Sequence, residues 1–351
     1  MAAKDKPPSL AAVAASAGVS VATVSKVVNG RADVGAETRA RIQTLLEEHQ
    51  YVARRTDSAG TAEETQTVEL VFHGEPTSYT LELLRGVAEE ATEAGVTLAI
   101  TIRARQRRGG NGQPSAEWVR SLARRGRTAV LDVVDDVRHG DLSALSRSRL
   151  PVVVLDPASL PRREVTSVGA TNFSGGFSAT QHLLRLGHVR IGYLGASPEI
   201  GFNQARMHGY RAALEAAGVT VPEEYVLSGE YDYDAGVAGG GALLDLPVPP
   251  TAIFAVTDES AAGVIEAARG RQLRVPEDLS IVGFDDTPLA RLLSPPLTTV
   301  RQPLREMGQV ALRTALRLAA GERLESHHVE LATELVVRSS TAPPSDQDRP
   351  A

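Results

Sequence analysis

Hydrophobic residues recur along most of the chain in two alternating patterns. Short, almost continuous runs of Val, Ile and Leu predict β-strands that are covered on both faces, as in parallel sheets. Longer stretches with apolar residues three and four positions apart predict amphipathic helices. The predicted strands are 68–72, 96–102, 128–134, 151–156, 189–195, 251–256 and 279–285. The predicted helices are 80–94, 115–126, 173–186, 203–217, 235–245, 259–271 and 303–320.

This alternation of strands and helices predicts a doubly wound α/β body. The number of strands favours two similar parallel-sheet lobes over one sheet. Proline-rich sequence near 295–303 is expected to return the chain to the first lobe. The loop at 103–114 is polar and rich in glycine, so its arginines favour a solvated turn over a nucleic-acid-binding patch.

The N-terminal region follows a different pattern, with helical spacing over two short segments. Gly18 lies between them, where a residue without Cβ allows a sharp turn at least cost. Ser20 is a good N-cap for the second segment. The apolar faces of the two segments contain Leu10, Val13, Ala14, Val24, Val27 and Val28. The pattern therefore predicts a small all-α head with a helix-turn-helix, the kind of motif that places its second helix in the major groove of DNA.

The sequence of this head resembles a known family. Residues 9–29, SLAAVAASAGVSVATVSKVVN, are similar to the N-terminal motif of the lactose-repressor (LacI/GalR) family, which reads close to TLxDVAxxAGVSxxTVSRVLN. The similarity continues through GRADVGAETRARIQTLLEEHQYV, a predicted third helix, and then over essentially all of residues 9–339.

The resemblance implies a division of the chain into four parts. These are a DNA-binding head (1–53), a hinge or linker (54–67), a two-lobed effector-binding and dimerisation body similar to periplasmic binding proteins (68–339), and a tail expected to be disordered (340–351). In the family the lobes interleave, which implies a first lobe of about 68–165 and 297–325 and a second lobe of about 166–296 and 327–338.

The outward face of the second helix carries short or hydrogen-bonding side chains that can approach DNA closely. Val21 and Ala22 are expected to touch base edges, and Lys26, where the family usually has arginine, to donate to a guanine. The residues expected to contact the DNA backbone are Thr23, Ser25, Asn29, Thr38 and Tyr51.

The segment RRTDSAGTAEETQ, residues 54–66, is polar and reads as a linker. In the family this segment folds on DNA and a leucine from it wedges into the minor groove, but Gly60 occupies that position here. Arg54 and Arg55 are still able to enter a narrow minor groove. A hinge helix and a flexible tether therefore both remain open.

Composition narrows the class of protein further. The chain contains no cysteine, which excludes disulfides and cysteine-ligated metals and fits a reducing cytoplasm. It shows neither an apolar run of about 18 residues nor a secretory signal, so we expect a cytoplasmic protein with no membrane span. We also expect no cofactor and no metal site.

Charge is divided unevenly along the chain. Residues 1–60 carry eight Lys/Arg and six Asp/Glu, whereas the whole chain has a net charge of −6. Attraction to DNA is therefore expected in the head. Because the basic excess is small, a homodimer binding two half-sites of double-stranded operator DNA is expected.

Ligands of doubly wound sheets bind outside the carboxyl ends of the strands. The polar residues that stand there are His73, Asp135, Asp136, Asp156, Ser197, Thr257, Asp258, Asp285 and Asp286. Such a carboxylate-rich cleft is suited to accept hydrogen bonds from sugar hydroxyls. Asp258 and Asp286 are more consistent with helix or turn capping, and His73 fits a ligand contact or an ordinary strand end equally well.

The family resemblance adds residues and roles to this candidate site. It implies that Arg206, in NQARMHGY, contacts the effector together with Asp156 and Asp285, and that Tyr231 stacks on the ligand. An arginine opposite Asp285 offers paired donors and acceptors for adjacent hydroxyls. Thr257 replaces the usual asparagine of the family, so hydrogen bonding there must differ. Tyr79 and Trp118 are interpreted as packing residues.

Together these features predict a sequence-specific transcriptional regulator, most simply a repressor, whose operator affinity is controlled by a small molecule such as a sugar in the interlobe cleft. No catalytic residue is expected, because no nucleophile elbow, phosphate-binding loop or GxGxxG stands at a strand-to-helix turn. The alternatives are a two-lobed solute-binding protein and a cleft enzyme acting on a carbohydrate.

Overall fold

The computed structural model describes residues 10–28, 34–48, 66–103, 116–133, 150–157 and 165–345. The chain forms two compact units, Met1–Glu64 and Thr65–Ala351, each with its own hydrophobic core. Several residues singled out above lie outside the described residues: Asn29, Tyr51, Arg54, Arg55, Gly60, Asp135 and Asp136.

The N-terminal unit, hereafter the head, contains the predicted helix-turn-helix. Its helices are α1 (Leu10–Ala17), α2 (Val21–Val28) and α3 (Ala36–Glu48). Gly18 has a φ of +65° at the turn, and the backbone N–H of Thr23 donates to the Ser20 Oγ at 3.1 Å, as expected of an N-cap. The core of the head consists of Val13, Ala14, Ala17, Val24, Val27 and Ile42.

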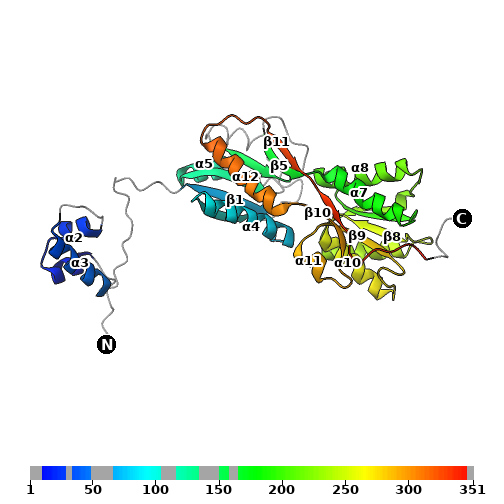
Figure 1. The fold of residues 1–351 in the computed structure, drawn as a ribbon, viewed down its shortest axis with the longest axis horizontal. Helices are drawn as coiled ribbons and strands as arrows, with labels where there is room; N and C mark the ends of the chain where they lie inside the picture. The colour runs from blue at the N-terminus through cyan, green and yellow to red at the C-terminus, as the bar shows by residue number, and fades with distance from the viewer. Residues whose placement is uncertain are drawn as a thin grey trace. The chain divides into compact units, whose positions relative to one another are not determined.

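The larger unit, hereafter the body, consists of two lobes, each built on a six-stranded sheet (Figure 1). The first sheet has the order β11-β5-β4-β3-β1-β2 and all its pairs are parallel. Its strands are β1 (Thr67–His73), β2 (Thr97–Arg103), β3 (Arg127–Val133), β4 (Val152–Leu155), β5 (Thr166–Ala170) and β11 (His328–Leu331). Its helices are α4 (Ser78–Glu93) and α12 (Leu304–Ala319), which pack together on one face, and α5 (Ala116–Arg124) on the other.

The second sheet has the order β12-β10-β9-β8-β6-β7 and is parallel except for the antiparallel β12. Its strands are β6 (Ile191–Ala196), β7 (Val226–Gly229), β8 (Ala252–Ala255), β9 (Ser280–Asp285), β10 (Thr298–Arg301) and β12 (Glu334–Val336). Its helices are α7 (Asn172–Arg185), α8 (Gly201–Ala216), α9 (Tyr233–Leu244), α10 (Asp258–Gly270) and the short α11 (Pro288–Leu292).

Both faces of the second sheet are covered, which explains why its strands read as continuous apolar runs. In β8, Phe254 packs into the cluster on the α7 and α8 side, whereas Ile253 and Ala255 pack into the cluster on the α9 and α10 side. The seven predicted strands and the seven predicted helices of the body are all present, with ends within two residues of those expected.

The expected limits of the lobes are wrong at the chain crossings. Residues 166–170, expected in the second lobe, form β5 and pair with β4 in the first sheet. Residues 298–301, expected in the first lobe, form β10 and pair with β9 in the second sheet. The last strand region, 327–338, is divided between β11 in the first sheet and β12 in the second. Short strands rich in Ser and Thr carry little of the apolar signal that marks the central strands, so their partners are not evident from periodicity.

Residues 340–345 are ordered, in contrast to the predicted disordered tail. Ser340 is fully buried, and its Oγ donates to the carbonyl of Ile281 at 2.6 Å and accepts from the N–H of Thr298 at 2.8 Å. The segment is held because it supplies hydrogen bonds that the second sheet needs. In the described part of the chain, no helix is long and apolar enough to cross a membrane.

Candidate functional site

Arg206 is buried at the carboxyl edge of the second sheet, where only 2% of its surface is exposed. Its Nε donates to the Asn172 Oδ1 at 2.8 Å and its Nη1 donates to the Val256 carbonyl at 2.6 Å. The guanidinium carbon lies 3.6 Å from the centre of the Phe284 ring. These contacts fix the orientation of a buried cation, as a binding site requires.

Two glycines bring the α8 backbone close enough to place this arginine. A Cβ on Gly176 of α7 would lie 2.2 Å from the Arg206 carbonyl oxygen, and a Cβ on Gly209 of α8 would lie 2.2 Å from the Phe173 carbonyl oxygen. The backbones of α7 and α8 are therefore in direct contact where the two helices cross. This crossing holds Arg206, three residues before Gly209, against the start of α7, where it meets Asn172.

Asp285 ends β9 and faces Arg206, with 3.8 Å between the Arg206 Nη1 and the Asp285 Oδ1. The Gln302 Nε2 donates to the same carboxylate oxygen at 2.7 Å. Burial raises the pKa of Asp285 well above its usual range, although the Arg206 charge opposes the shift. Asp285 also has a φ of 117°, which is rare for a residue with a Cβ.

Asp156 follows β4 in the first lobe and is also buried, with a φ of 48°. It accepts from the Tyr79 hydroxyl at 3.0 Å and from the Asn172 Nδ2 at 3.4 Å. Burial raises the pKa of Asp156 and raises the pKa of Tyr79 well above its usual value, so the phenol stays a donor. Backbone strain at such residues often marks functional sites. Tyr79 therefore does more than pack, in contrast to the prediction.

Asn172 and Gln302 are parts of this site that sequence reasoning missed. The Asn172 amide joins Arg206 of the second lobe to Asp156 of the first. The Gln302 Oε1 is buried and has no hydrogen-bond partner among the described residues. Asn172 lies just after β5 and Gln302 just after β10. The rule of searching the carboxyl ends of strands would have found both residues if these two strands had been predicted.

Three of the predicted effector residues lie outside this network of Arg206, Asp156 and Asp285. The His73 Nε2 lies 2.7 Å from the Asp132 Oδ1 on neighbouring strands. Thr257 is the N-cap of α10 and forms a capping box with Ser260. Its hydroxyl also donates to the Tyr231 carbonyl at 2.8 Å.

The Tyr231 ring is connected to the arginine through a second aromatic residue. It packs edge-to-face on Phe202 with 5.7 Å between ring centres, and Phe202 in turn lies 4.8 Å from the Arg206 guanidinium carbon. Tyr231 therefore stands at the border of the cluster.

The other two predicted acids of the second lobe have structural partners. Asp258 is fully buried and accepts from the Thr299 hydroxyl at 2.6 Å and from the Thr287 N–H at 2.8 Å. Asp286 accepts from Arg301 and Arg338. These partners differ from the predicted capping of the following helices: α10 is capped by Thr257, Asp258 joins Thr287 to Thr299, and Asp286 forms ion pairs with two arginines.

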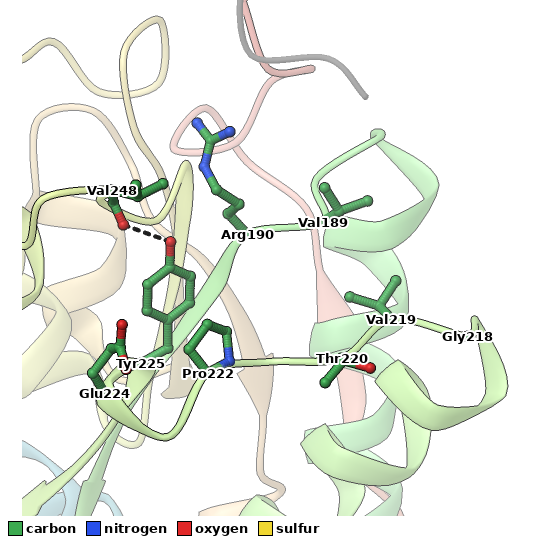
Figure 2. Close-up of a pocket in the computed structure, with 9 residues that line it drawn as sticks. All are labelled: Val189, Arg190, Gly218, Val219, Thr220, Pro222, Glu224, Tyr225 and Val248. Atoms are coloured by element: carbon green, nitrogen blue, oxygen red, sulfur yellow. Dashed lines mark hydrogen bonds between the residues drawn. The ribbon is translucent and has the colours of Figure 1, made fainter. Parts of the chain in front are cut away.

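A separate pocket of about 580 Å³ lies elsewhere in the second lobe (Figure 2). Arg190, Tyr225 and Val248 precede β6, β7 and β8, so this pocket stands at the amino ends of the strands. The Tyr225 hydroxyl donates to the Val248 carbonyl at 2.6 Å across its wall (Figure 2). It shares no residue with the Arg206 cluster, which occupies the end where ligands of such sheets bind.

The head presents the predicted DNA-contacting face to solvent. Val21, Ala22 and Lys26 are exposed on α2, and Val21 has 47% of its surface accessible. An exposed valine on this helix is suited to apolar contact with a thymine methyl group. Thr23, Ser25 and Thr38 are partly exposed, and the Thr23 hydroxyl lies 2.8 Å from that of Ser20.

Comparison with known proteins gives the same division of the chain. The family model "Bacterial regulatory proteins, lacI family" matches residues 9–53, and "Periplasmic binding protein-like domain" matches residues 180–341. The HTH-type transcriptional regulator DegA of Bacillus subtilis is 33% identical over 336 residues, which are 94% of this chain and 97% of DegA.

Solved structures extend the similarity to the fold. The transcriptional regulator CelR–cellobiose complex is 32% identical with a TM-score of 0.70, over 95% of this chain and 99% of that one. The lac repressor dimer bound to operator and the anti-inducer ONPF is 24% identical with a TM-score of 0.76, over 96% of this chain and 100% of that one. The latter comparison shows a shared fold.

Proposed function

This chain belongs to the LacI family of bacterial regulatory proteins, and we propose that it is a transcriptional repressor whose operator affinity is set by a small hydroxylated ligand. In this proposal residues 1–53 bind DNA, residues 54–67 form the hinge, and residues 68–339 bind the ligand and a second copy of the chain. The protein acts in the cytoplasm, where its operator is.

The observation that carries this proposal is that two recognition surfaces lie on separate units of the chain. The head exposes the polar and short side chains of α2. The body buries Arg206, Asp156 and Asp285 in one network and leaves the Gln302 Oε1 without a partner in the part of the chain that the structure describes. A buried acceptor without a donor is costly unless something completes it. A ligand with donors would complete it.

The ligand that fits this network carries hydroxyl groups. The Gln302 Oε1 is a buried acceptor without a donor among the described residues, and Asp156 and Asp285 add carboxyl oxygens that accept. A ligand that donates hydrogen bonds is therefore favoured. The CelR structure contains cellobiose, a ligand of this class.

The remaining predicted effector residues contribute at the border of this network. In this proposal Tyr231 stacks on a ring of the ligand. His73 and Thr257 contribute less, because their polar groups already hold hydrogen bonds within the protein.

On DNA, Val21 and Ala22 touch base edges and Lys26 donates to a guanine. Backbone contacts come from Thr23, Ser25, Asn29, Thr38 and Tyr51, and minor-groove contacts from Arg54 and Arg55. Replacing Lys26 with alanine should cost about 1–3 kcal/mol at one base pair per half-site.

A second copy of the chain is proposed to cover an apolar edge of the first lobe. Leu81 on α4 and Ile100 and Ile102 on the edge strand β2 each expose about half of their surface or more. Clustered exposed aliphatic residues on an edge strand favour association. The dimer supplies two heads, which compensates for their small basic excess.

The proposal is tested by comparing DNA retardation by the full chain with that by the chain lacking residues 1–66, using duplexes selected from a random library. Calorimetry with a panel of mono- and disaccharides then identifies the ligand, and addition of that saccharide should change retardation. A solute-binding protein or an enzyme would retard no duplex, so equal results for the two chains would refute a regulator.

A further inference from the structure

The two lobes of the body are joined by three chain crossings, which follow β5, β10 and β11. Two of the crossings bond to each other: the Thr171 N–H donates to the Leu331 carbonyl at 2.9 Å, and the Thr333 N–H donates to the Thr171 Oγ1 at 3.0 Å. Covalent crossings of this kind restrain the lobes but do not by themselves hold the cleft closed.

A further contact joins the lobes away from these crossings. The backbone N–H of Ser78, the first residue of α4 in the first lobe, donates to the Glu259 Oε1 in the first turn of α10 in the second lobe at 3.3 Å. Each residue is next to the ligand network. Ser78 precedes Tyr79, which holds Asp156, and Glu259 lies two residues after Thr257, which holds the loop of Tyr231.

We infer that Glu259 is a latch that holds the two lobes closed across the cleft through the Ser78 backbone N–H. The latch is a positioning device: Glu259 needs no contact with the ligand, and it sets how far the wall that carries Tyr79 stands from the wall that carries Tyr231.

The first turn of a helix explains why this contact forms. The N–H groups there have no partner within the helix, and the positive end of the helix dipole favours a carboxylate. The Thr77 side chain caps the N–H of Thr80. The N–H of Ser78 is thus available to a carboxylate from the other lobe.

The same contact is weak enough to release. Glu259 is partly buried, and burial raises its pKa, with a further increase from Asp232 and a decrease from the Ser78 hydrogen bond. Its carboxylate therefore regains hydration when the lobes separate. Closure gains one hydrogen bond at the expense of that hydration, so the net contribution of the latch to closure is small.

The test measures the distance between the lobes in the full chain without ligand or DNA. Because the chain has no cysteine, Glu93→Cys on α4 and Ala216→Cys on α8, both exposed, allow one dye on each lobe for single-molecule energy transfer. Labelled chains are mixed with an excess of unlabelled chains, so that a dimer carries at most one labelled body.

Two variants remove the latch from opposite sides. Ser78→Pro deletes the donor at the first position of a helix, where proline is favoured, and the extended backbone of Thr77 (φ −106°, ψ 172°) suits a residue before proline. Glu259→Ala deletes the acceptor. Each should raise the ratio of open to closed lobes roughly twofold to tenfold. The double variant should be no more open than either single one.

Matched controls separate the latch from unfolding. Ser78→Ala keeps the N–H and should leave the distances unchanged, as should Glu266→Ala, a partly exposed residue of the same α10 helix whose carboxylate pairs with Arg269. Glu259→Gln keeps an accepting oxygen and should be intermediate. Unchanged distances in Glu259→Ala, or additive effects in the double variant, would overturn the latch. A role in ligand response rests on the proposed function, whereas this measurement needs no ligand, so the two can fail separately.

Discussion

Two buried acids at the carboxyl edge of the second sheet have the same chemistry but different surroundings. Asp258, after β8, accepts hydrogen bonds from the hydroxyl of Thr299 and from both the N–H and the hydroxyl of Thr287. Asp285, at the end of β9, accepts from Gln302 and lies 3.8 Å from Arg206. The Gln302 Oε1 itself has no partner among the residues that the structure describes.

We propose that this difference separates a structural acid, Asp258, from a ligand-binding acid, Asp285. The hydrogen-bonding capacity of the Asp258 carboxylate is filled by neutral donors, Thr287 at the N-cap of α11 and Thr299 in β10. Asp258 therefore fixes the segment of chain that leads to the first lobe. The surroundings of Asp285 leave acceptor capacity unfilled, which is costly in a folded protein unless a ligand fills it. Burial alone does not identify a binding residue, whereas the balance of donors and acceptors around it does.

The largest expected effect follows from substituting each acid by its isosteric amide. Asp285→Asn should weaken binding of the selected saccharide roughly 10- to 100-fold, because the amide nitrogen cannot accept a hydrogen bond where a carboxyl oxygen can. Asp258→Asn should change it less than about twofold, because the hydrogen bonds of Asp258 go to Thr287 and Thr299 and not to Arg206 or Gln302. Calorimetry gives both values, and operator affinity without ligand should be the same in both variants. Equal losses of saccharide affinity would show that the two acids are not functionally distinct.

The second expected effect concerns stability. Asp258→Ala should lower the free energy of unfolding by about 2–3 kcal/mol, because the Thr287 N–H and the Thr299 hydroxyl lose their acceptor inside the core. Asp285→Asn should lower it by less than about 1 kcal/mol, since the amide oxygen still accepts from Gln302. Urea unfolding of the ligand-free chain measures both. If Asp285→Asn lowered the free energy of unfolding more than Asp258→Ala does, Asp285 and not Asp258 would be the structural acid.

The third prediction uses the protonation of Asp258. Burial raises the pKa of Asp258 to about 7, against the hydrogen bonds from Thr299 and Thr287 that lower it. In the unfolded chain the pKa of an aspartate is about 3.9. The folded state therefore holds the proton more tightly, and its contribution to stability is complete below the unfolded pKa and is lost as pH rises through about 7.

Unfolding in urea at several pH values between 5 and 8 tests this sign. The free energy of unfolding should fall with rising pH in the unmodified chain, and Asp258→Asn, which cannot ionise, should reduce the slope. Part of the slope should remain, because burial also raises the pKa of Asp156 and Asp285. A slope identical in the two proteins would mean that Asp258 is charged throughout this range.

The sequence predicts the central part of this architecture because apolar runs and helical periodicity directly record burial. The central strands carry continuous Val, Ile and Leu, and Arg206, Asp156 and Asp285 follow from the ends of predicted strands and from the family motif. The structure brings these three residues together.

What the sequence does not predict lies where burial is not recorded in apolar side chains. β5 reads TSVGA and β10 reads TTVR, and their small polar residues are buried because neighbouring strands and helices cover them. Because these two strands are not predicted, the polar residues that follow them, Asn172 and Gln302, are not predicted as site residues either. The Tyr79 hydroxyl was overlooked for a related reason: its ring packs into the first-lobe core while its polar end reaches Asp156.

The smallest expected effects come from adding a Cβ at two glycines, each of which lies near the carboxylate of a different acid. A Cβ on Gly283 would lie 2.7 Å from the Asp258 Oδ1 and equally close to Leu297, whereas a Cβ on Gly169 would meet only the Asp156 Oδ1, at 3.8 Å. Gly283→Ala should therefore cost about 1–2 kcal/mol through overpacking. Gly169→Ala makes an ordinary contact and should change stability by less than about 1 kcal/mol.

Saccharide affinity then sharpens the comparison of the two acids. Gly283→Ala displaces a carboxylate that only holds the fold, so calorimetry at a temperature where the variant is folded should give an affinity within about twofold of the unmodified chain. Gly169→Ala leaves Asp156 in place and should do the same. If Gly283→Ala lowered the saccharide affinity as strongly as Asp285→Asn does, the position of the Asp258 carboxylate would have to affect ligand binding. Asp258 would then influence binding as well as stability, and the distinction between the two acids would be wrong.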